Sequence, residues 1–301
     1  FGGHLTTDLA RWSGTAALTV LVRERGGAPT FVIGRDTRAS GPILEDALVE
    51  GILAGGGNVI RAGVVPTPAV AFLTAELGVE CGVVISASHI PSEASSYVDH
   101  VVSAAEARLD GMRVVVDCAN GAASAFAPAV LARLGAEVVA INDEPTGANI
   151  NVDCGALHPD VVAEAVVANG ADAGVAHDGD ADRALFADAE GNVIDGDQVL
   201  AACAIAMKGD ETLTGDAVVA TVMSNLGFHR AMREHGIRVI SAPVGDRYVL
   251  EQMLEHQVAL GGEQSGHVIF RDQATTGDGL ITAARFLRVG DLVLLLEPLG
   301  L

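Results

Sequence analysis

The sequence of 301 residues has a single lysine, Lys208, and only 4% aromatic residues. No apolar run approaches the roughly 20 uncharged residues that a membrane span needs, and no secretory signal peptide is visible. The cysteines form no Cys-x-x-Cys pair, so neither a zinc site nor a disulfide framework is expected. We therefore predict a cytoplasmic protein that enters no membrane and keeps free thiols at Cys81, Cys118, Cys154 and Cys203.

Positive charge is also scarce. The chain has 18 basic and 39 acidic residues, which gives a formal net charge of −21. Because nucleic-acid phosphates are bound through lysine and arginine, we expect no nucleic-acid partner. A phosphorylated small molecule would have to be held by local arginines and backbone amides.

Aliphatic residues are abundant and follow an alternating strand and helix pattern, with hydrophobic residues making up 50% of the chain. Apolar strands followed by glycine or polar turns and alanine-rich helices are typical of parallel βαβ units. This predicts an α/β fold of three consecutive domains with mixed, mainly parallel sheets. Strands are predicted at 30–34, 58–64, 81–85, 112–117, 137–141, 217–221 and 238–240, and helices at 42–53, 128–134 and 227–235. Predicted boundaries give domains at 1–110, 111–211 and 212–290, with 291–301 as a possible remnant of a fourth.

The run Asp178-Gly179-Asp180-Ala181-Asp182-Arg183 carries the most informative chemical pattern. Three carboxylates spaced two residues apart in a tight loop after a strand can bind one divalent cation. Hard oxygen ligands in this number suit magnesium, which keeps room for a phosphate oxygen. The adjacent arginine can hold an anion, so the run predicts phosphate chemistry at a metal.

Three other interpretations of this run were weighed. An acidic turn on a solvated surface is the simplest. A calcium-binding EF-hand loop fits poorly, because Arg183 and Ala189 stand where that loop needs glycine and glutamate. A phosphatase of the haloacid-dehalogenase type, with an aspartate as nucleophile, stays open, although that family uses a downstream lysine and only Lys208 is present.

Two further polar runs follow predicted strands. Ser88, beside His89, can accept a phosphoryl group, with an ordinary turn as the alternative. In the run 261–267, Glu263, Ser265 and His267 offer donors and acceptors suited to sugar hydroxyls, with a polar hairpin as the alternative.

Together and in this order, the three runs resemble the α-D-phosphohexomutase superfamily of phosphoglucomutases and phosphomannomutases, and most closely its bacterial phosphoglucosamine mutase branch. Gln264 resembles that branch, since the glucose and mannose mutases tend to carry methionine there. Other segments that carry the resemblance are Ile33–Arg38, Pro66–Pro68, Val116–Ala122, Met223–Asn225, Val244–Tyr248 and Thr276–Gly279.

The resemblance implies an isomerase that interconverts glucosamine 6-phosphate and glucosamine 1-phosphate through a phosphoserine and a bisphosphate intermediate. It implies Mg²⁺ as cofactor, a hexosamine phosphate as the small-molecule partner, and a monomer or homodimer. The implied metal ligands are Ser88, Asp178, Asp180 and Asp182, and the implied catalytic residues are Ser88, His89, Arg35, Arg38 and Arg183. The implied substrate-binding residues are Glu263, Ser265, His267, Asp246 and Arg247. A glucose or mannose mutase of the same superfamily and a non-catalytic sugar-phosphate-binding homologue stay open.

The chain departs from the family pattern in three places. Ile90-Pro91-Ser92 follows His89 where the family has Asn-Pro and a later Gly-x-Lys. The amino-terminal Thr-Asp-Gly-x-Arg-Gly is missing, and so is the Arg-x-Ser-Gly-Thr phosphate clamp of a fourth, carboxyl-terminal domain. We expect that the natural protein is longer and contains these segments, which the present sequence omits.

Overall fold

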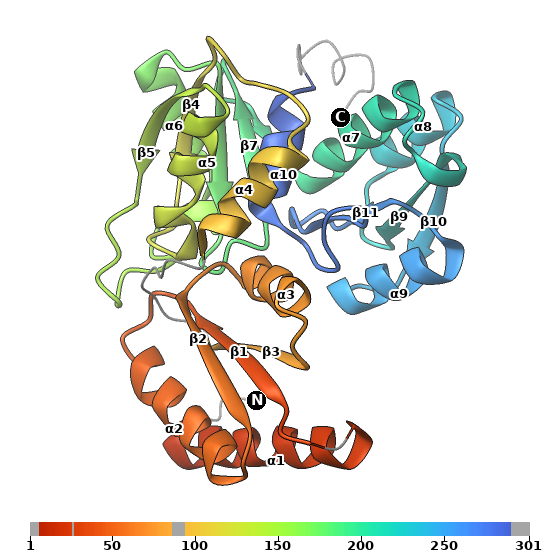
Figure 1. Ribbon diagram of the computed structural model, residues 1–301. Coiled ribbons are helices and arrows are strands. Elements are labelled where there is room, and N and C mark those ends of the chain that lie inside the picture. The colour runs from red at the N-terminus through yellow and green to blue at the C-terminus, as the bar shows by residue number, and fades with distance from the viewer. Residues whose placement is uncertain (1–5, 26, 86–93, 290–301) are drawn as a thin grey trace.

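The computed structural model describes residues 6–25, 27–85 and 94–289, which form three lobes, each built on its own β-sheet (Figure 1). Two of the sheets are mixed and one is parallel throughout. This confirms the predicted α/β fold with mixed, mainly parallel sheets. The predicted remnant of a fourth domain, 291–301, lies outside the described residues.

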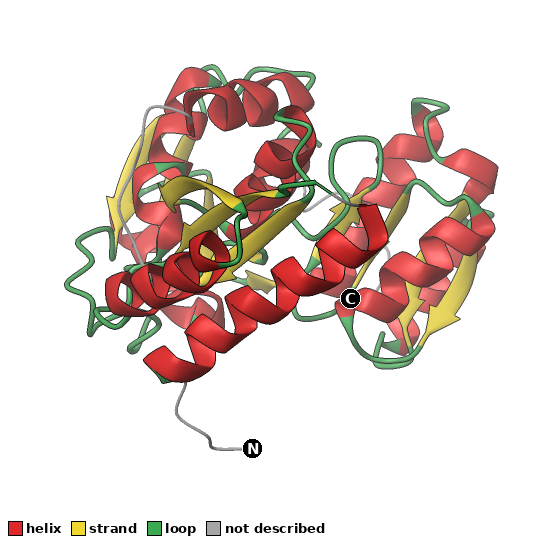
Figure 2. Cartoon of the chain, turned by 60° about the horizontal axis from the view of Figure 1, so that its bottom comes forward, coloured by secondary structure: helices red, strands yellow, loops and turns green. Residues whose placement is uncertain are grey.

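The first lobe has the parallel strand order β2-β1-β3. Because side chains alternate along a strand, Phe31 and Ile33 face a core with Leu48 and Ile52, whereas Val32 joins the core on the other face. Its elements are α1 (Thr7–Arg25), β1 (Thr30–Arg35), α2 (Gly41–Ala54), β2 (Asn58–Val64), α3 (Thr67–Glu76) and β3 (Cys81–Ile85). The next helix, α4 (Ala94–Ala104), lies beside α5 (Ala127–Arg133) and α10 (Gly279–Leu287) (Figure 1). Figure 2 shows α1 as the long helix that begins beside the N-terminus.

The second lobe has the strand order β5-β4-β6-β7-β8, in which β5, β4 and β6 are parallel and β7 and β8 are antiparallel additions. Val162 and Val166 of its second helix cover Val115 on one face of the sheet. The elements are β4 (Arg113–Asp117), α5 (Ala127–Arg133), β5 (Glu137–Ile141), α6 (Pro159–Asn169), β6 (Ala173–His177), β7 (Ala184–Asp188) and β8 (Val193–Ile194).

The third lobe has the order β10-β9-β11-β12, with only β12 antiparallel to its neighbour. Its elements are α7 (Gly196–Gly209), β9 (Ala217–Thr221), α8 (Leu226–Glu234), β10 (Arg238–Ala242), α9 (Asp246–His256), β11 (Leu260–Gly262), β12 (Val268–Phe270) and α10 (Gly279–Leu287). Side-chain caps fix where three of these helices begin: Asp195 caps α7, Asn225 caps α8 and Asp278 caps α10.

Helix α10 joins the lobes. All nine of its residues are buried, and it contacts α4, α5, α7, β7 and β12. Figure 1 shows it between the second and third sheets. A helix that is buried on every side belongs to the interior of the molecule, so α10 fixes how the lobes meet. Among the described residues, no helix is both long and apolar enough to cross a membrane.

Candidate active site

The predicted site segments lie where parallel strands end. Arg35 is the last residue of β1, the aspartate loop (178–183) follows β6, and Glu263 follows β11. Open α/β sheets bind ligands at this edge of the sheet. The backbone N–H of Thr67, just after β2, donates to the carbonyl of Asp180 at 3.0 Å, so the first lobe touches the aspartate loop directly.

The three carboxylates of the aspartate loop converge. Ligand oxygens of Asp178, Asp180 and Asp182 all lie within 4.8 Å of one another. Ala181, between the last two, has a φ of 57°, which turns the chain sharply. Burial, followed by the neighbouring carboxylates, raises the pKa of Asp178 well above its usual range, and burial also raises the pKa of Asp182. The loop therefore gathers negative charge that its own surroundings do not neutralise.

Backbone hydrogen bonds hold the aspartate loop in this shape. The carbonyl of Gly179 accepts from Ala122 at 2.8 Å, and the carbonyl of Ala181 accepts from Gly279 at 3.0 Å. These donors come from the second and third lobes, and Thr67 adds one from the first. The carboxylates thus cannot separate without breaking contacts between lobes.

This donor set fits a divalent cation. Oδ1 of Asp182 is buried and accepts no hydrogen bond within the described part of the chain. Nε of Arg183 lies 3.9 Å from Asp178 and 3.8 Å from Asp182, and the side chain is 40% exposed, so it offsets the charge only in part. Three carboxylates around one point are the hard oxygen ligands that such cations prefer.

The two arginines at and just after the end of β1 are each paired with a carboxylate. Arg35 donates to Glu45, and Arg38 donates to Asp36 at 2.6 Å. Asp36 is itself buried, and burial raises its pKa to about 6, with Asp180 adding to the rise. The charge of Asp180 in the aspartate loop therefore acts on the residue that follows β1.

A cavity of about 510 Å³ joins the aspartate loop to the 261–267 loop. Asp182 and Arg183 line it from the second lobe, and Glu263, Ser265 and His267 line it from the third. Its size and polar lining suit a small polar ligand. The other lining residues are Thr221, Met223, Val244, Gly245, Asp246 and Gln264.

Hydrogen bonds shape the 261–267 loop in advance of any ligand. Oε1 of Glu263 accepts from the backbone N–H of Gly245 at 2.9 Å. Nε2 of the buried His267 accepts from the backbone N–H of Gly277 at 3.1 Å and lies 3.7 Å from a carboxylate oxygen of Asp182. The loop is therefore tied to the aspartate loop through His267.

Five of the predicted site residues that the structure describes do not line this cavity: Arg35, Arg38, Asp178, Asp180 and Arg247. Arg247 donates to Glu251 at 2.8 Å on the exposed side of α9. Ser88 and His89 lie outside the described residues. The strand before them, β3, ends at Ile85, whose carbonyl accepts a backbone hydrogen bond from the residue that follows β1. The roles of Arg247, Ser88 and His89 stay predictions.

The structure adds residues to which the sequence assigned no role. Thr67 fixes the aspartate loop, Met223 and Val244 line the cavity, and Gly277 and Gly279 bridge two loops. All of them belong to segments that carry the family resemblance. Most of their contacts are made by backbone amides, which almost any residue type supplies, so residue type alone gave no indication of a role.

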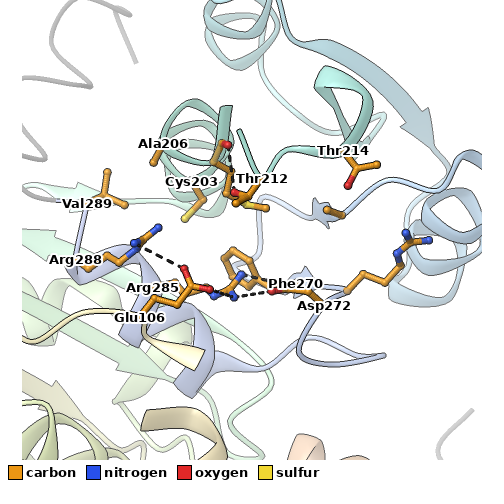
Figure 3. A pocket seen from close by; sticks show the side chains of 13 residues that line it. Glu106, Cys203, Ala206, Thr212, Thr214, Phe270, Asp272, Arg285, Arg288 and Val289 are labelled. Atoms are coloured by element: carbon orange, nitrogen blue, oxygen red, sulfur yellow. Dashed lines mark hydrogen bonds and ion pairs between the residues drawn. The ribbon is translucent and has the colours of Figure 1, made fainter. Parts of the chain in front are cut away.

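A second cavity, of about 440 Å³, contains none of the predicted site residues (Figure 3). Arg285 in its wall contacts Asp272 at 2.7 Å and Glu106 at 3.4 Å, and Arg288 contacts Asp210 at 3.1 Å. Arg285 and Arg288 are thus each paired with carboxylates. Arg271, which also lines this cavity, donates to the carbonyl of Met253 at 3.5 Å.

Comparisons with known proteins agree with this geometry. Three family models match the chain: phosphoglucomutase/phosphomannomutase alpha/beta/alpha domain I at residues 1–98, domain II at 95–191 and domain III at 195–291. The phosphoglucosamine mutase of Symbiobacterium thermophilum is 45% identical over 335 residues, covering 95% of this chain and 75% of that protein. That of Frankia casuarinae is 47% identical over 352 residues, covering 98% and 77%.

Two solved structures are similar as well. A phosphoglucomutase/phosphomannomutase family protein from Burkholderia thailandensis has a TM-score of 0.80 and 28% identity, covering 99% of this chain and 77% of its own. The N-acetylphosphoglucosamine mutase of Aspergillus fumigatus, solved with GlcNAc-6P and magnesium, has a TM-score of 0.69 and 20% identity, covering 90% and 65%. At that identity the second likeness shows a shared fold alone.

Proposed function

Because the chain belongs to the phosphoglucomutase/phosphomannomutase family, we propose that it acts as a phosphoglucosamine mutase, an isomerase that interconverts glucosamine 6-phosphate and glucosamine 1-phosphate. One observation carries this proposal. The cavity that Glu263 and Ser265 line is also lined by Asp182, one of the three clustered carboxylates, so we place phosphoryl chemistry and sugar binding at one site. The similarity to proteins named phosphoglucosamine mutase supports the choice of sugar.

In the proposed reaction, Oγ of Ser88 carries a phosphoryl group at rest. A hydroxyl of the hexosamine monophosphate attacks this phosphorus, the bond to Ser88 breaks, and a bisphosphate forms. The bisphosphate then reverses its orientation within the cavity and returns its other phosphate to Ser88. Each transfer breaks one P–O bond and forms another, so no phosphate is lost. Such transfers depend mainly on in-line positioning and charge neutralisation.

Asp178, Asp180 and Asp182, together with Ser88, would hold Mg²⁺ at this site. When bound, the ion supplies Lewis-acid neutralisation of the transferring phosphoryl group. The chain holds its carboxylates together through backbone contacts from three lobes, so the ligands do not need to be reorganised when the ion binds. Arg183 lines the cavity beside them, where it would hold the phosphoryl oxygens.

The 261–267 loop would orient the sugar. Glu263 and Ser265 accept from and donate to hydroxyls, while His267, held by a backbone amide, supports the loop next to the metal ligands. Asp246 also lines the cavity and can bind the same ligand. Nε2 of Gln264 donates to Asp195 at 3.1 Å, which ties the residue that marks the phosphoglucosamine branch to the cap of α7.

The remaining predictions stay part of this proposal. His89, Arg35 and Arg38 would stabilise charge and move protons near Ser88, and Arg247 would bind substrate. Residues 1–110 would bear the phosphoserine, 111–211 the metal site and 212–290 the sugar site, and each sheet lies within one of these segments. We also propose a monomer or homodimer in the cytoplasm, where Cys81, Cys118, Cys154 and Cys203 remain the free thiols that the structure contains.

The test measures conversion of glucosamine 6-phosphate with Mg²⁺ and a catalytic amount of glucosamine 1,6-bisphosphate. Phosphopeptide mapping after incubation with the bisphosphate labelled in its phosphates then shows which residue accepts the phosphoryl group. We expect label on Ser88 and faster turnover of glucosamine phosphate than of glucose or mannose phosphate. Faster turnover of mannose phosphate would overturn the substrate. Label on Asp178 or Asp180 would indicate a phosphatase, and binding without any label would indicate a non-catalytic homologue.

A further inference from the structure

The turn Gly277-Asp278-Gly279 (the 277–279 turn) lies between the two loops that line the active-site cavity. The N–H of Gly277 donates to Nε2 of His267 in the 261–267 loop at 3.1 Å. The N–H of Gly279 donates to the carbonyl of Ala181 in the aspartate loop at 3.0 Å. Two amides separated by one residue, Asp278, thus set the spacing between the aspartate loop and the 261–267 loop.

Only glycine fits on either side of this turn. A Cβ at position 277 would lie 2.3 Å from the ring of His267, and a Cβ at position 279 would lie 2.4 Å from the carbonyl oxygen of Arg183. The backbone of the turn therefore lies directly against a cavity-lining side chain and against the aspartate loop. A small movement of the turn must move both.

The side chain of Asp278 fixes the turn. Its Oδ1 accepts from the backbone N–H groups of Leu280 and Ile281, both at 3.0 Å, and so caps α10. The hydroxyl of Tyr97 donates to the same carboxylate, at 3.0 Å to Oδ1 and 2.9 Å to Oδ2. Asp278 is 2% exposed and Tyr97 is 0% exposed, so water does not replace either partner.

Tyr97 brings in a third functional segment. It lies on α4, which begins at Ala94 soon after Ser88 in the sequence. Its ring is held by Phe72 and Phe126, each with a ring-centroid distance of 6.0 Å. The hydroxyl is therefore presented by a rigid aromatic cluster.

We propose that Tyr97 and Asp278 are positioning residues for the mutase reaction. Their hydrogen bond holds the 277–279 turn in place. The backbone amides of Gly277 and Gly279 in this turn then fix the distance between the aspartate loop and the 261–267 loop. Neither side chain lines the cavity, so neither is expected to touch the substrate. The inference deepens the proposed function and rests on it for the reaction, though not for cation binding.

The test compares Y97F, D278A and D278N with the unaltered chain. Mn²⁺ titration followed by electron paramagnetic resonance reports the cation site, and kcat and KM for glucosamine 6-phosphate report the reaction. Y97F and D278A should weaken Mn²⁺ binding about tenfold, as expected for partners that orient metal ligands, and should lower kcat more than they raise KM. D278N, which still accepts from the amides and the hydroxyl, should recover most of both.

V101A is the matched control, because Val101 is a buried residue one turn further along α4. It should lose stability as Y97F does but bind Mn²⁺ like the unaltered chain. Mn²⁺ dissociation constants for Y97F and D278A within twofold of that for V101A would overturn the proposal. If the unaltered chain binds Mn²⁺ yet converts no hexosamine phosphate, the proposed function fails, and the Mn²⁺ titrations alone decide the positioning role.

Discussion

At the scale of single residues, the aspartate loop is the feature on which the chemistry depends. Its carboxylates are partly buried and close together, and the resulting pKa of Asp178 shows that their charge is uncompensated. A cation that binds there displaces the proton that the raised pKa of Asp178 favours, and it meets carboxylates that the fold has already brought together. This is preorganisation in the electrostatic sense.

Asp180→Asn tests this directly. We expect mutase activity to fall by about 10² to 10³, the loss typical of removing one preorganised electrostatic contact. Without metal, the variant should be at least as stable as the unaltered chain, because one repelling charge is gone. Thermal unfolding in EDTA and in Mg²⁺, together with activity assays, measures both effects.

Asp160→Asn is the control for this variant, because Asp160 is an exposed aspartate at the start of α6. It should change neither activity nor the stabilisation by Mg²⁺. If Asp180→Asn retained the full rise in melting temperature with Mg²⁺, the aspartate loop would not be the cation site.

The sequence predicted this loop because its ligands are local, each two residues from the next and directly after a strand. It also predicted Glu263, Ser265 and His267, which line the cavity. The structure pairs Arg247 with Glu251 one helical turn away, a contact that the motif did not indicate, because the direction of an exposed side chain depends on its neighbours in space. The sequence assigned no role to the buried Tyr97, because its partner Asp278 lies 181 residues away in the chain.

At the scale of elements, α10 depends on one buried carboxylate at its first turn. Burial raises the pKa of Asp278 from 3.8 to about 6, opposed by its hydrogen bonds from Ile281, Tyr97 and Leu280. The charged group that adds to the rise is Asp182, from the aspartate loop. The folded protein thus binds this proton more tightly than the unfolded chain does.

The sign of the pH dependence follows from this difference. Between pH 4 and 6 the folded state holds more protons at Asp278 than the unfolded state, so its contribution to stability falls as the pH rises. We expect the free energy of unfolding, relative to D278N, to drop by about 2–3 kcal/mol between pH 4 and pH 7. Urea unfolding of both proteins at several pH values measures it, and a difference that stayed constant or grew would contradict the assignment.

Most strands, and the helices α2, α5 and α8, could be predicted from local pattern. The predicted 58–64, 81–85 and 137–141 coincide with β2, β3 and β5. Helix α10 was not predicted. All nine of its residues are buried, so its sequence lacks the helical alternation of apolar and polar positions from which an amphipathic helix is recognised. The antiparallel β7 and β8 were missed as well, since pairing direction depends on how the chain returns after the aspartate loop.

At the scale of the whole molecule, the lobes are joined by a few buried contacts centred on α10. Asp278 at its start contacts α4 through Tyr97, and Arg285 near its end donates to the carbonyl of Ala104 at 3.0 Å. The guanidinium of Arg285 also lies 4.7 Å above the ring of Phe270. Both ends of α10 thus contact α4, while Arg285 also contacts the third sheet through Phe270.

Arg285→Met tests this joint. Methionine keeps much of the apolar contact with Phe270, but it leaves the carbonyl of Ala104 without its donor and removes the ion pairs with Asp272 and Glu106. Because Asp272 is half exposed, we expect a loss of about 2–3 kcal/mol in the free energy of unfolding, below the range for a fully buried pair. Arg230→Met, which breaks an exposed pair with Glu234, should change stability little. Urea unfolding measures both variants, and equal stability would show that α10 is not held through Arg285.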